Sequence, residues 1–480
     1  MKRTTPKLLK SNVRFDCSRA ADGVVPHAGL AVLADFCDRT GLSAVLSPVI
    51  PFSGRTVPVF DRGRLLSSMM LMLADGGDRC TDYRVVKATN AVLGVSPSER
   101  TLRRMISDIA ATPDGVDTVN TAFNQVRSEL WRRQGWCDPT GTTILDIDAT
   151  LVNVHTEKQD AQPTFRRGFG FHPIWCFADR TGEALAVKFR PGNAAANTIA
   201  DLVEVIDRAL DALPAELSDR YRPGAVVNEP SGPSILVRSD SAAATRGLTW
   251  ACWDRDIRFS FTGRTCAPIE STILGFDNDT PWEPALPAPY LAKNDHEIDP
   301  GRAQVTEITG KPAIVEWLGQ TLKTDPDSLR YPPGTRVIIR REPLHPGAQQ
   351  RLFDVDGWRH TILLCDTPDV SAVEADRRHR EHARVEAHIK ELKALGHNLF
   401  PFKDTARNNV WTHTIGWTQA MLCWWRHTDL ADTELADAQP KRLRYTILHT
   451  PALAVRTARQ TWIRWPTHWP WTPLIHQLTG

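Results

Sequence analysis

The sequence lacks the features that mark several common protein classes. No stretch of about 18 uninterrupted apolar residues occurs, so a membrane-spanning helix is not expected. The nine cysteines stand singly and form no CxxC pair, which argues against a disulfide framework and a structural zinc site. The 15 histidines include no HxH or HExxH pattern, so a histidine-based metal enzyme is not indicated. With 41% apolar and 24% charged residues, the chain is expected to fold as an ordinary globular protein.

Length and charge set further limits. A chain of 480 residues is long for one hydrophobic core, so we expect two or three domains. The opening residues, "MKRTTPKLLKSNVRFD", are basic but lack the apolar core of a signal peptide, so we expect a cytoplasmic protein with no membrane partner. The net charge of +2 says little, but positive charge is concentrated in 441–480, which contain six Lys or Arg and no Asp or Glu.

The pattern of apolar residues changes several times along the chain. Residues 1–135 are mostly helical by pattern, as in "GRLLSSMMLMLADG". Residues 136–264 predict strands at "TTILDIDATLVNV", "GFGFHPIWCFAD" and "GEALAVKFRPGN", a helix from Asn197 to Leu213, and strands at "SILVRSD" and "IRFSFTGR". This order predicts a mixed α/β layer.

The second half of the chain continues this organisation. Residues 265–372 predict a β-rich insertion with strands at "TRVIIRREP" and "WRHTILLC". Residues 373–430 begin with a strong helix, Val373 to Leu395, that closes at Gly396. Residues 431–480 form a basic, tryptophan-rich segment that we expect to be largely helical.

Two aspartates interrupt the first of these strands, in "TILDIDATLV". Asp146 and Asp148 are two residues apart, so a regular strand directs both to the same face. Two carboxylates in an apolar setting repel each other unless a cation compensates them, and a hard divalent ion such as Mg²⁺ does so with oxygen ligands. The alternative is that one or both pair with an arginine, such as Arg166 or Arg167.

Two further acidic residues follow at positions that suit chemistry. Asp240 ends the strand "SILVRSD", and α/β folds place their sites at such carboxyl ends of strands. Its alternative role is that of a helix N-cap. Glu386, Lys390 and Lys393 share one helical face, which by itself is equally typical of an exposed Glu/Lys ladder.

The order of Asp, Asp and Glu, with a long insertion before the Glu, resembles that of the DDE transposases. Within them the chain resembles the bacterial insertion-sequence group whose last motif is Tyr, two residues, Arg, three residues, Glu, six residues, Lys. Glu386 and Lys393 meet the second half of this motif, whereas His379 and His382 occupy the Tyr and Arg positions. The motifs "LDIDAT", "FHPIWCF", "LVRSDS", "RVEAHIKELK" and "FPFKDTARNNVW" together resemble insertion-sequence family 1380, which is related in chemistry to piggyBac-type elements.

This resemblance implies the fold and the site. The catalytic domain is expected to be RNase H-like, with a mixed sheet flanked by helices. Asp148, which precedes a small residue and threonine, is expected to be the first catalytic aspartate, with Asp146 as the fallback. Asp148, Asp240 and Glu386 would hold two Mg²⁺ ions, with Mn²⁺ as a substitute, and Asp148 would be shared between the ions. Lys393 is expected to neutralise a phosphate near the scissile bond.

The resemblance also implies how the protein contacts DNA. His379, His382 and Arg384 are the expected contacts near the Glu386 motif, with Arg380 as a further candidate. An aromatic ring of the insertion is expected to stack on a flipped base, and Trp358, Trp317 and Trp282 are the candidates, Trp358 foremost.

The expected partners follow from the same family. They are double-stranded DNA and a second copy of the chain, because two element ends must be brought together, and the protein is expected to be associated with the nucleoid. Two alternatives stay open. One is an RNase H-like nuclease without strand transfer, and the other is an inactive relic that only binds DNA.

Overall fold

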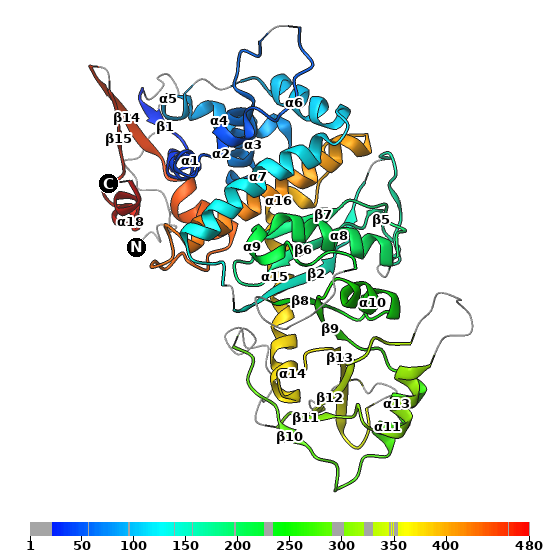
Figure 1. The fold of residues 1–480 in the computed structure, drawn as a ribbon. Coiled ribbons are helices and arrows are strands. Elements are labelled where there is room, and N and C mark those ends of the chain that lie inside the picture. The colour runs from blue at the N-terminus through cyan, green and yellow to red at the C-terminus, as the bar shows by residue number, and fades with distance from the viewer. Residues whose placement is uncertain are drawn as a thin grey trace, which may run out of the picture.

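The computed structural model describes residues 22–55, 57–94, 97–138, 140–155, 157–195, 198–224, 234–289, 302–320, 330–344, 347, 349, 354–458 and 460–479. The basic opening stretch and Asn197, the expected helix cap, lie outside these residues. Figure 1 shows the N-terminal helices beside the C-terminal segment at one end of the molecule and the insertion at the other. In the described residues, no helix is long and apolar enough to cross a membrane.

A nine-stranded mixed sheet runs through the centre, in the order β10-β11-β12-β13-β9-β8-β2-β6-β7. Strand β2 pairs antiparallel with β6, which pairs antiparallel with β7. On its other side β2 pairs in parallel with β8, and β8 pairs in parallel with β9. These five strands confirm the predicted strands, and they are β2 (Thr142–Ala149), β6 (Ile174–Ala178), β7 (Ala184–Lys188), β8 (Ser234–Ser239) and β9 (Arg258–Thr262).

The helices that connect these strands pack on the sheet through one apolar stripe. Helix α8 (Ile199–Ala212) buries Leu202, Val205 and Ala209 at helical spacing and contacts β6 and β7. Helix α10 (Arg246–Asp254) joins β8 to β9, and Thr245 caps it by accepting a hydrogen bond from the Leu248 N–H. The short α9 (Ala215–Ser218) follows α8.

The insertion extends the same sheet instead of forming a separate one. Strand β13 pairs antiparallel with β9, with Leu363 opposite Thr262, so the sheet continues from β9 into β13, β12, β11 and β10. The two predicted strands are confirmed as β12 and β13. The elements of the insertion are α11 (Ala267–Leu274), β10 (Glu283–Pro284), β11 (Gln304–Glu307), α13 (Pro312–Gly319), β12 (Arg336–Pro343) and β13 (Trp358–Cys365).

The N-terminal region is helical, as predicted. Its longest helices bury an apolar face, and α3 ends at Gly76, whose φ of +105° lies in the left-handed region that favours glycine. The helices are α1 (Leu30–Arg39), α2 (Leu42–Leu46), α3 (Arg62–Asp75), η1 (Cys80–Asp82), α4 (Tyr83–Ala88), α5 (Asn90–Leu93), α6 (Glu99–Ala111) and α7 (Gly115–Arg133).

The long helix predicted after the insertion is present as consecutive segments. Its predicted end at Gly396 is confirmed by a φ of +96°. The buried 23-residue helix α16 follows and contacts α3, α6 and β7. The segments are α14 (Ala372–Arg380), η2 (Glu381–Ala383), α15 (Arg384–Leu392), η3 (Lys393–His397) and α16 (Thr405–His427).

The expectation of a largely helical C-terminal segment is wrong in its centre. Strands β14 (Ala452–Thr457) and β15 (Gln460–Arg464) form a hairpin, and β14 pairs with β1 (Val24–Val25) at the other end of the chain. The pairing partner lies more than 400 positions away, so no local pattern reveals it. Helical turns flank the hairpin as α17 (Pro440–Leu443), η4 (Arg444–Leu448) and α18 (Thr472–Thr479).

One hydrophobic core joins parts of the chain that the sequence analysis separates. It includes Leu66 and Met69 of α3, Trp175 of the sheet, and Trp411 of α16. A second core lies between the sheet and α8. The N-terminal helices and the residues after the insertion therefore fold together. Between β2 and β6 in the chain, a small three-stranded sheet forms in the order β3 (Val152–Asn153), β5 (Phe169–Phe171) and β4 (Gln162–Pro163).

A buried carboxyl group makes the stability of this fold depend on pH. Asp366 is 4% exposed and accepts a hydrogen bond from the Phe259 N–H at 2.7 Å. Burial raises the pKa of Asp366 to about 7, although that N–H and Arg258 oppose the shift. In the unfolded chain, Asp366 ionises near pH 4. The contribution of the buried, protonated carboxyl group to the free energy of unfolding is therefore complete below about pH 4, and it falls by up to about 1.4 kcal/mol per pH unit until pH 7.

Asp366→Asn removes this titration. The free energy of unfolding of the wild type is expected to fall progressively below that of Asp366→Asn between about pH 4 and 7, and the difference is expected to stay constant above about pH 8. Urea unfolding at a series of pH values measures it. A difference that does not change with pH would contradict the prediction.

Candidate active site

The register of two parallel strands brings two of the predicted site residues together. Ile147 of β2 lies opposite Ser239 of β8, and the Ser239 hydroxyl donates to the Ile147 carbonyl at 2.9 Å. Asp148 and Asp240 are the next residues on the two strands. They therefore lie side by side at the carboxyl ends of neighbouring parallel strands, where α/β sheets bind ligands.

Asp240 is not the helix N-cap that its sequence allows. Helix α10 begins six residues later and is capped by Thr245. One Asp240 oxygen accepts a hydrogen bond from the Ala242 N–H at 2.9 Å, and the side chain is otherwise exposed. The carboxylate is therefore available at the end of the strand.

Glu386 reaches the same place from helix α15, which contacts β2. Its negative charge and that of Asp240 both act on Asp148. Glu386 is exposed, and within the described residues no ion pair joins it to Lys390 or Lys393. The three acidic residues thus gather at one edge of the sheet, and the Glu/Lys ladder is absent there.

Asp146 has a different environment from Asp148. It is fully buried, and both of its oxygens accept hydrogen bonds from Arg238, at 2.8 and 2.7 Å. The His382 Nδ1 lies 2.8 Å from one of these oxygens. Although burial opposes ionisation, Arg238 and His382 hold the pKa of Asp146 well below its usual range. The charge of Asp146 is therefore compensated within the protein. The predicted pairing with an arginine is confirmed, but the partner is Arg238 and not Arg166 or Arg167.

Among the described residues, no arginine or lysine forms an ion pair with Asp148. Burial raises the pKa of Asp148 to about 6, and repulsion from Asp240 and Glu386 adds to the shift while His382 opposes it. Its one hydrogen bond in the described structure comes from the Ala149 N–H, at 2.7 Å. Three oxygen-donor side chains with uncompensated repulsion form a donor set suited to a hard divalent cation.

The ion pair of Asp146 belongs to a network that fixes the helix carrying Glu386. Arg238 also donates to Asp179 at 2.6 Å and to the carbonyl of Arg378 on α14 at 2.6 Å. Asp179 in turn accepts from Arg384 at 3.1 Å. These hydrogen bonds connect strands β2 and β8 with helices α14 and α15, the elements next to the three carboxylates. Sequence reasoning missed Arg238, although an arginine inside the apolar run "SILVRSD" is a detectable signal.

Two basic residues predicted near the site, Lys393 and Arg384, differ in their surroundings. Lys393 begins η3, one residue after α15 ends, and is partly exposed. Arg384 is 31% exposed and pairs with Asp179 and Glu381, so part of its guanidinium is engaged within the network.

The two histidines at the Tyr and Arg positions are largely internal. His379 is 9% exposed, and its ring nitrogens lie 2.9 Å from the Ser260 hydroxyl and 3.0 Å from that of Thr262. Burial lowers the pKa of His379 to about 3. Both nitrogens are occupied and the ring has almost no surface, so the expected DNA contact by His379 is not supported. His382 is 13% exposed and faces Asp146.

The tryptophans of the insertion surround an arginine. The Arg341 guanidinium carbon lies 3.9 Å from the centre of the Trp282 ring and 4.5 Å from that of Trp358. Trp317 packs on Tyr331, with ring centres 4.9 Å apart. A ring face of Trp282 and of Trp358 is therefore covered by a cation, and Trp358 is partly exposed.

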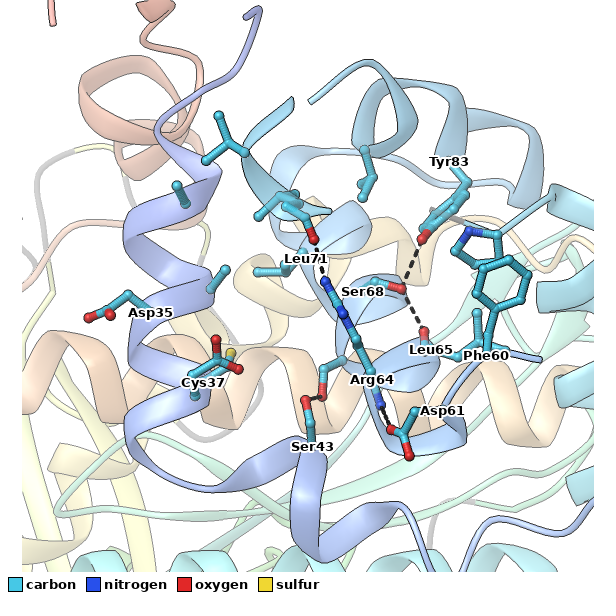
Figure 2. A pocket seen from close by; sticks show the side chains of 18 of the residues that line it. Asp35, Cys37, Ser43, Phe60, Asp61, Arg64, Leu65, Ser68, Leu71 and Tyr83 are labelled. Carbon is cyan, nitrogen blue, oxygen red and sulfur yellow. Dashed lines mark hydrogen bonds between the residues drawn. The ribbon is translucent and has the colours of Figure 1, made fainter. Parts of the chain in front are cut away.

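A cavity of about 660 Å³ is lined by residues of the N-terminal helical region. Figure 2 shows hydrogen bonds among the residues that line it: the Tyr83 hydroxyl donates to the Ser68 hydroxyl at 3.0 Å, and the Asp61 carboxylate accepts from the Arg64 backbone N–H at 2.7 Å. Its lining includes none of the three acidic residues. The cavity thus contributes nothing to the candidate active site.

Comparison with known proteins assigns the chain to a family. The family model described as "Transposase DDE domain group 1" matches residues 9–480. The chain belongs to this family of DDE transposases. No curated protein matches the sequence. Among solved structures, a piggyBac transposase synaptic complex with hairpin DNA is similar at 9% identity and a TM-score of 0.42, covering 88% of this chain and 80% of that one.

The chain is a mixed α/β protein in which two aspartates end neighbouring strands and one glutamate approaches on a helix. The transposase family match covers the helical N-terminal region, the sheet, the insertion and the C-terminal hairpin.

Proposed function

We propose that this protein is the transposase of a bacterial insertion sequence of the group with the Tyr-Arg-Glu-Lys motif, family 1380. It binds the terminal inverted repeats of its element, cuts the DNA and joins the 3′-hydroxyl ends to a target. The observation that carries the proposal is the electrostatic contrast within β2. Asp146 is neutralised by Arg238, while Asp148 lies near Asp240 and Glu386 and forms no ion pair with an arginine or lysine in the part of the chain that the structure describes.

The three carboxylates fit the divalent ions that such chemistry needs. Asp148, Asp240 and Glu386 offer only oxygen donors, the ligands that Mg²⁺ and Mn²⁺ prefer, and their mutual repulsion favours a bound cation. Two Mg²⁺ ions held there would activate a water or a 3′-hydroxyl and stabilise the leaving oxygen of the phosphodiester. Lys393, which follows Glu386 by seven residues, supplies a positive charge for a nearby phosphate.

The fold supports the same proposal. The order β7-β6-β2-β8-β9, antiparallel on one side of β2 and parallel on the other, is the arrangement expected of an RNase H-like catalytic domain. We assign the catalytic core to residues 136–264 and 373–430, interrupted by the insertion 265–372. The helical region 1–135 and the basic segment 431–480 are proposed to bind DNA.

Three residues near the core remain proposed DNA contacts: Arg384, which is partly exposed, His382 beside it, and Trp358, whose ring stacks with Arg341. Arginine and an aromatic face suit phosphate and base contacts. The active form is proposed to be a homodimer on double-stranded DNA, associated with the nucleoid in the cytoplasm.

The deciding experiment follows the products made from DNA that carries an end of the element, incubated with the full-length protein and Mg²⁺ or Mn²⁺. The proposal predicts metal-dependent cleavage at the end, followed by joined products when target DNA is added. Cleavage without joining would favour the nuclease alternative. Binding without cleavage in either ion would identify an inactive relic, to which the internal His379 and His382 give some support.

A further inference from the structure

Two histidines and an aspartate converge at a place far from the candidate active site in sequence. His27 precedes α1, Asp75 is the last residue of α3, and His449 follows η4. One ligand atom from each lies within 4.8 Å of the other two. The N-terminal residues, the end of a central helix and the C-terminal segment therefore meet at this cluster.

The nitrogens of both rings point to the same carboxylate. The His27 Nδ1 lies 2.8 Å from one Asp75 carboxylate oxygen. The His449 Nε2 lies 3.3 Å from the other and 3.0 Å from the Asp75 backbone carbonyl oxygen, a contact that it would give up on binding an ion. In a tetrahedral site with bonds of about 2.0–2.1 Å, neighbouring ligand atoms are roughly 3.3 Å apart. The two nitrogen-to-oxygen separations are near this value, and all three ligand atoms lie within 4.8 Å of one another, so rotation of these side chains would bring them to an ion.

The charges in the cluster favour a shared cation. The Asp75 carboxylate is buried at the carboxyl end of α3, where the helix dipole is unfavourable to a negative charge. The two imidazole rings stack with centres 4.2 Å apart, so protonating both would place two positive charges face to face. Without an ion, the hydrogen bond to Asp75 raises the pKa of His449, so a protonated ring serves as the counter-charge. A divalent ion would replace that proton and compensate the carboxylate, with both rings as neutral ligands.

The surroundings leave room for such an ion. Arg444 also faces Asp75, but its guanidinium donates hydrogen bonds to the carbonyls of Leu73, Ala74 and Ala394. A cavity of about 440 Å³, lined in part by Thr81, Asp82 and Arg84, opens on His27 and Asp75. His27 itself adopts a φ of +50°, an uncommon conformation for a residue with a side chain.

We propose that His27, Asp75 and His449 form a second metal site, for Zn²⁺ or a similar borderline divalent ion, distinct from the carboxylate site for Mg²⁺. Imidazole nitrogens select such ions over Mg²⁺, and two histidines with one carboxylate leave one position of a four-coordinate ion open. The ion would link the C-terminal segment to the residues before α1 and to the end of α3, close in sequence to the strands β1 and β14 that pair with each other. It stabilises the joined chain ends and takes no part in strand cleavage.

The test is titration of metal-free, full-length protein with Zn²⁺ in excess Mg²⁺, which keeps the carboxylate-only site occupied by Mg²⁺. Calorimetry is expected to show one tight Zn²⁺ per chain, and thermal unfolding a rise in Tm. His449→Gln, whose side chain is 39% exposed and therefore replaceable, loses both effects. The matched control is His468→Gln with His476→Gln, two exposed histidines of the same segment.

Three results would overturn the proposal. They are equal Zn²⁺ binding by wild type and His449→Gln, no binding by wild type, and a Tm that responds to the protonation of the histidines but not to Zn²⁺. Circular dichroism confirms that each variant is folded. Asp75→Asn provides an independent check, because it keeps the shape of the side chain and removes the charge.

Discussion

Replacing Asp148, Asp240 or Glu386 with alanine is expected to lower the rate of end cleavage by roughly three orders of magnitude or more, because each is proposed to supply charge that holds the ions at the reacting phosphate. DNA binding should stay near the wild-type level, since these residues offer no positive charge to the backbone. Single-turnover cleavage of labelled end DNA, with binding measured in parallel, gives both quantities.

The control for this experiment is Glu129→Ala, which removes an exposed carboxylate from helix α7. It should cleave as wild type does. Normal cleavage by any of the three alanine variants would remove that residue from the metal site. A parallel loss of binding and cleavage would instead indicate that the variant is misfolded.

The second large effect is a difference in stability between variants of Asp146 and of Asp148, which are two residues apart on β2. Asp146→Ala leaves Arg238 buried without its main partner, and breaking a buried ion pair in this way is expected to lower the free energy of unfolding by about 3–5 kcal/mol. Asp148→Ala removes a carboxylate that burial and repulsion destabilise, so its stability should equal or exceed that of wild type. Urea unfolding of both variants without metal measures the contrast.

A double variant tests the cause. Asp146→Leu with Arg238→Met replaces the pair by apolar side chains and is expected to recover much of the loss, because the unpaired charge is removed. Equal destabilisation by Asp146→Ala and Asp148→Ala would mean that the two aspartates do not differ as described. Asp146→Ala is accordingly a poor control for catalysis, since any loss of activity could follow from its loss of stability.

The sequence was sufficient for the strands and for the candidate acidic residues. Alternation and β-branched residues predicted β2, β6 and β8, and the step from strand to small residues after Asp240 marked the end of β8. These features depend on neighbours within a few positions. The choice of Asp148 over Asp146 depended on the family resemblance, and the burial of Asp146 against Arg238 now provides a physical reason for it.

Features set by distant contacts could not be read from the chain. The Arg238 partner of Asp146 lies 92 positions away, and it is the parallel register of β2 and β8 that brings the two together. His379 looks exposed on a polar helix, but Ser260 and Thr262 of β9 enclose it. The hairpin β14–β15 forms where β1 offers an edge. In each case the decisive partner comes from another region of the sequence.

The central claim is that Asp148 binds the divalent ion that cleavage requires, and a change of metal preference tests it directly. A thiolate binds Mn²⁺ far better than it binds Mg²⁺, because Mg²⁺ is a hard ion that prefers oxygen. End cleavage by Asp148→Cys should therefore be lost in Mg²⁺ and recovered in Mn²⁺, while the wild type cleaves in both. If Asp148→Cys responds in the same way to both ions, whether active or inactive, the claim is contradicted.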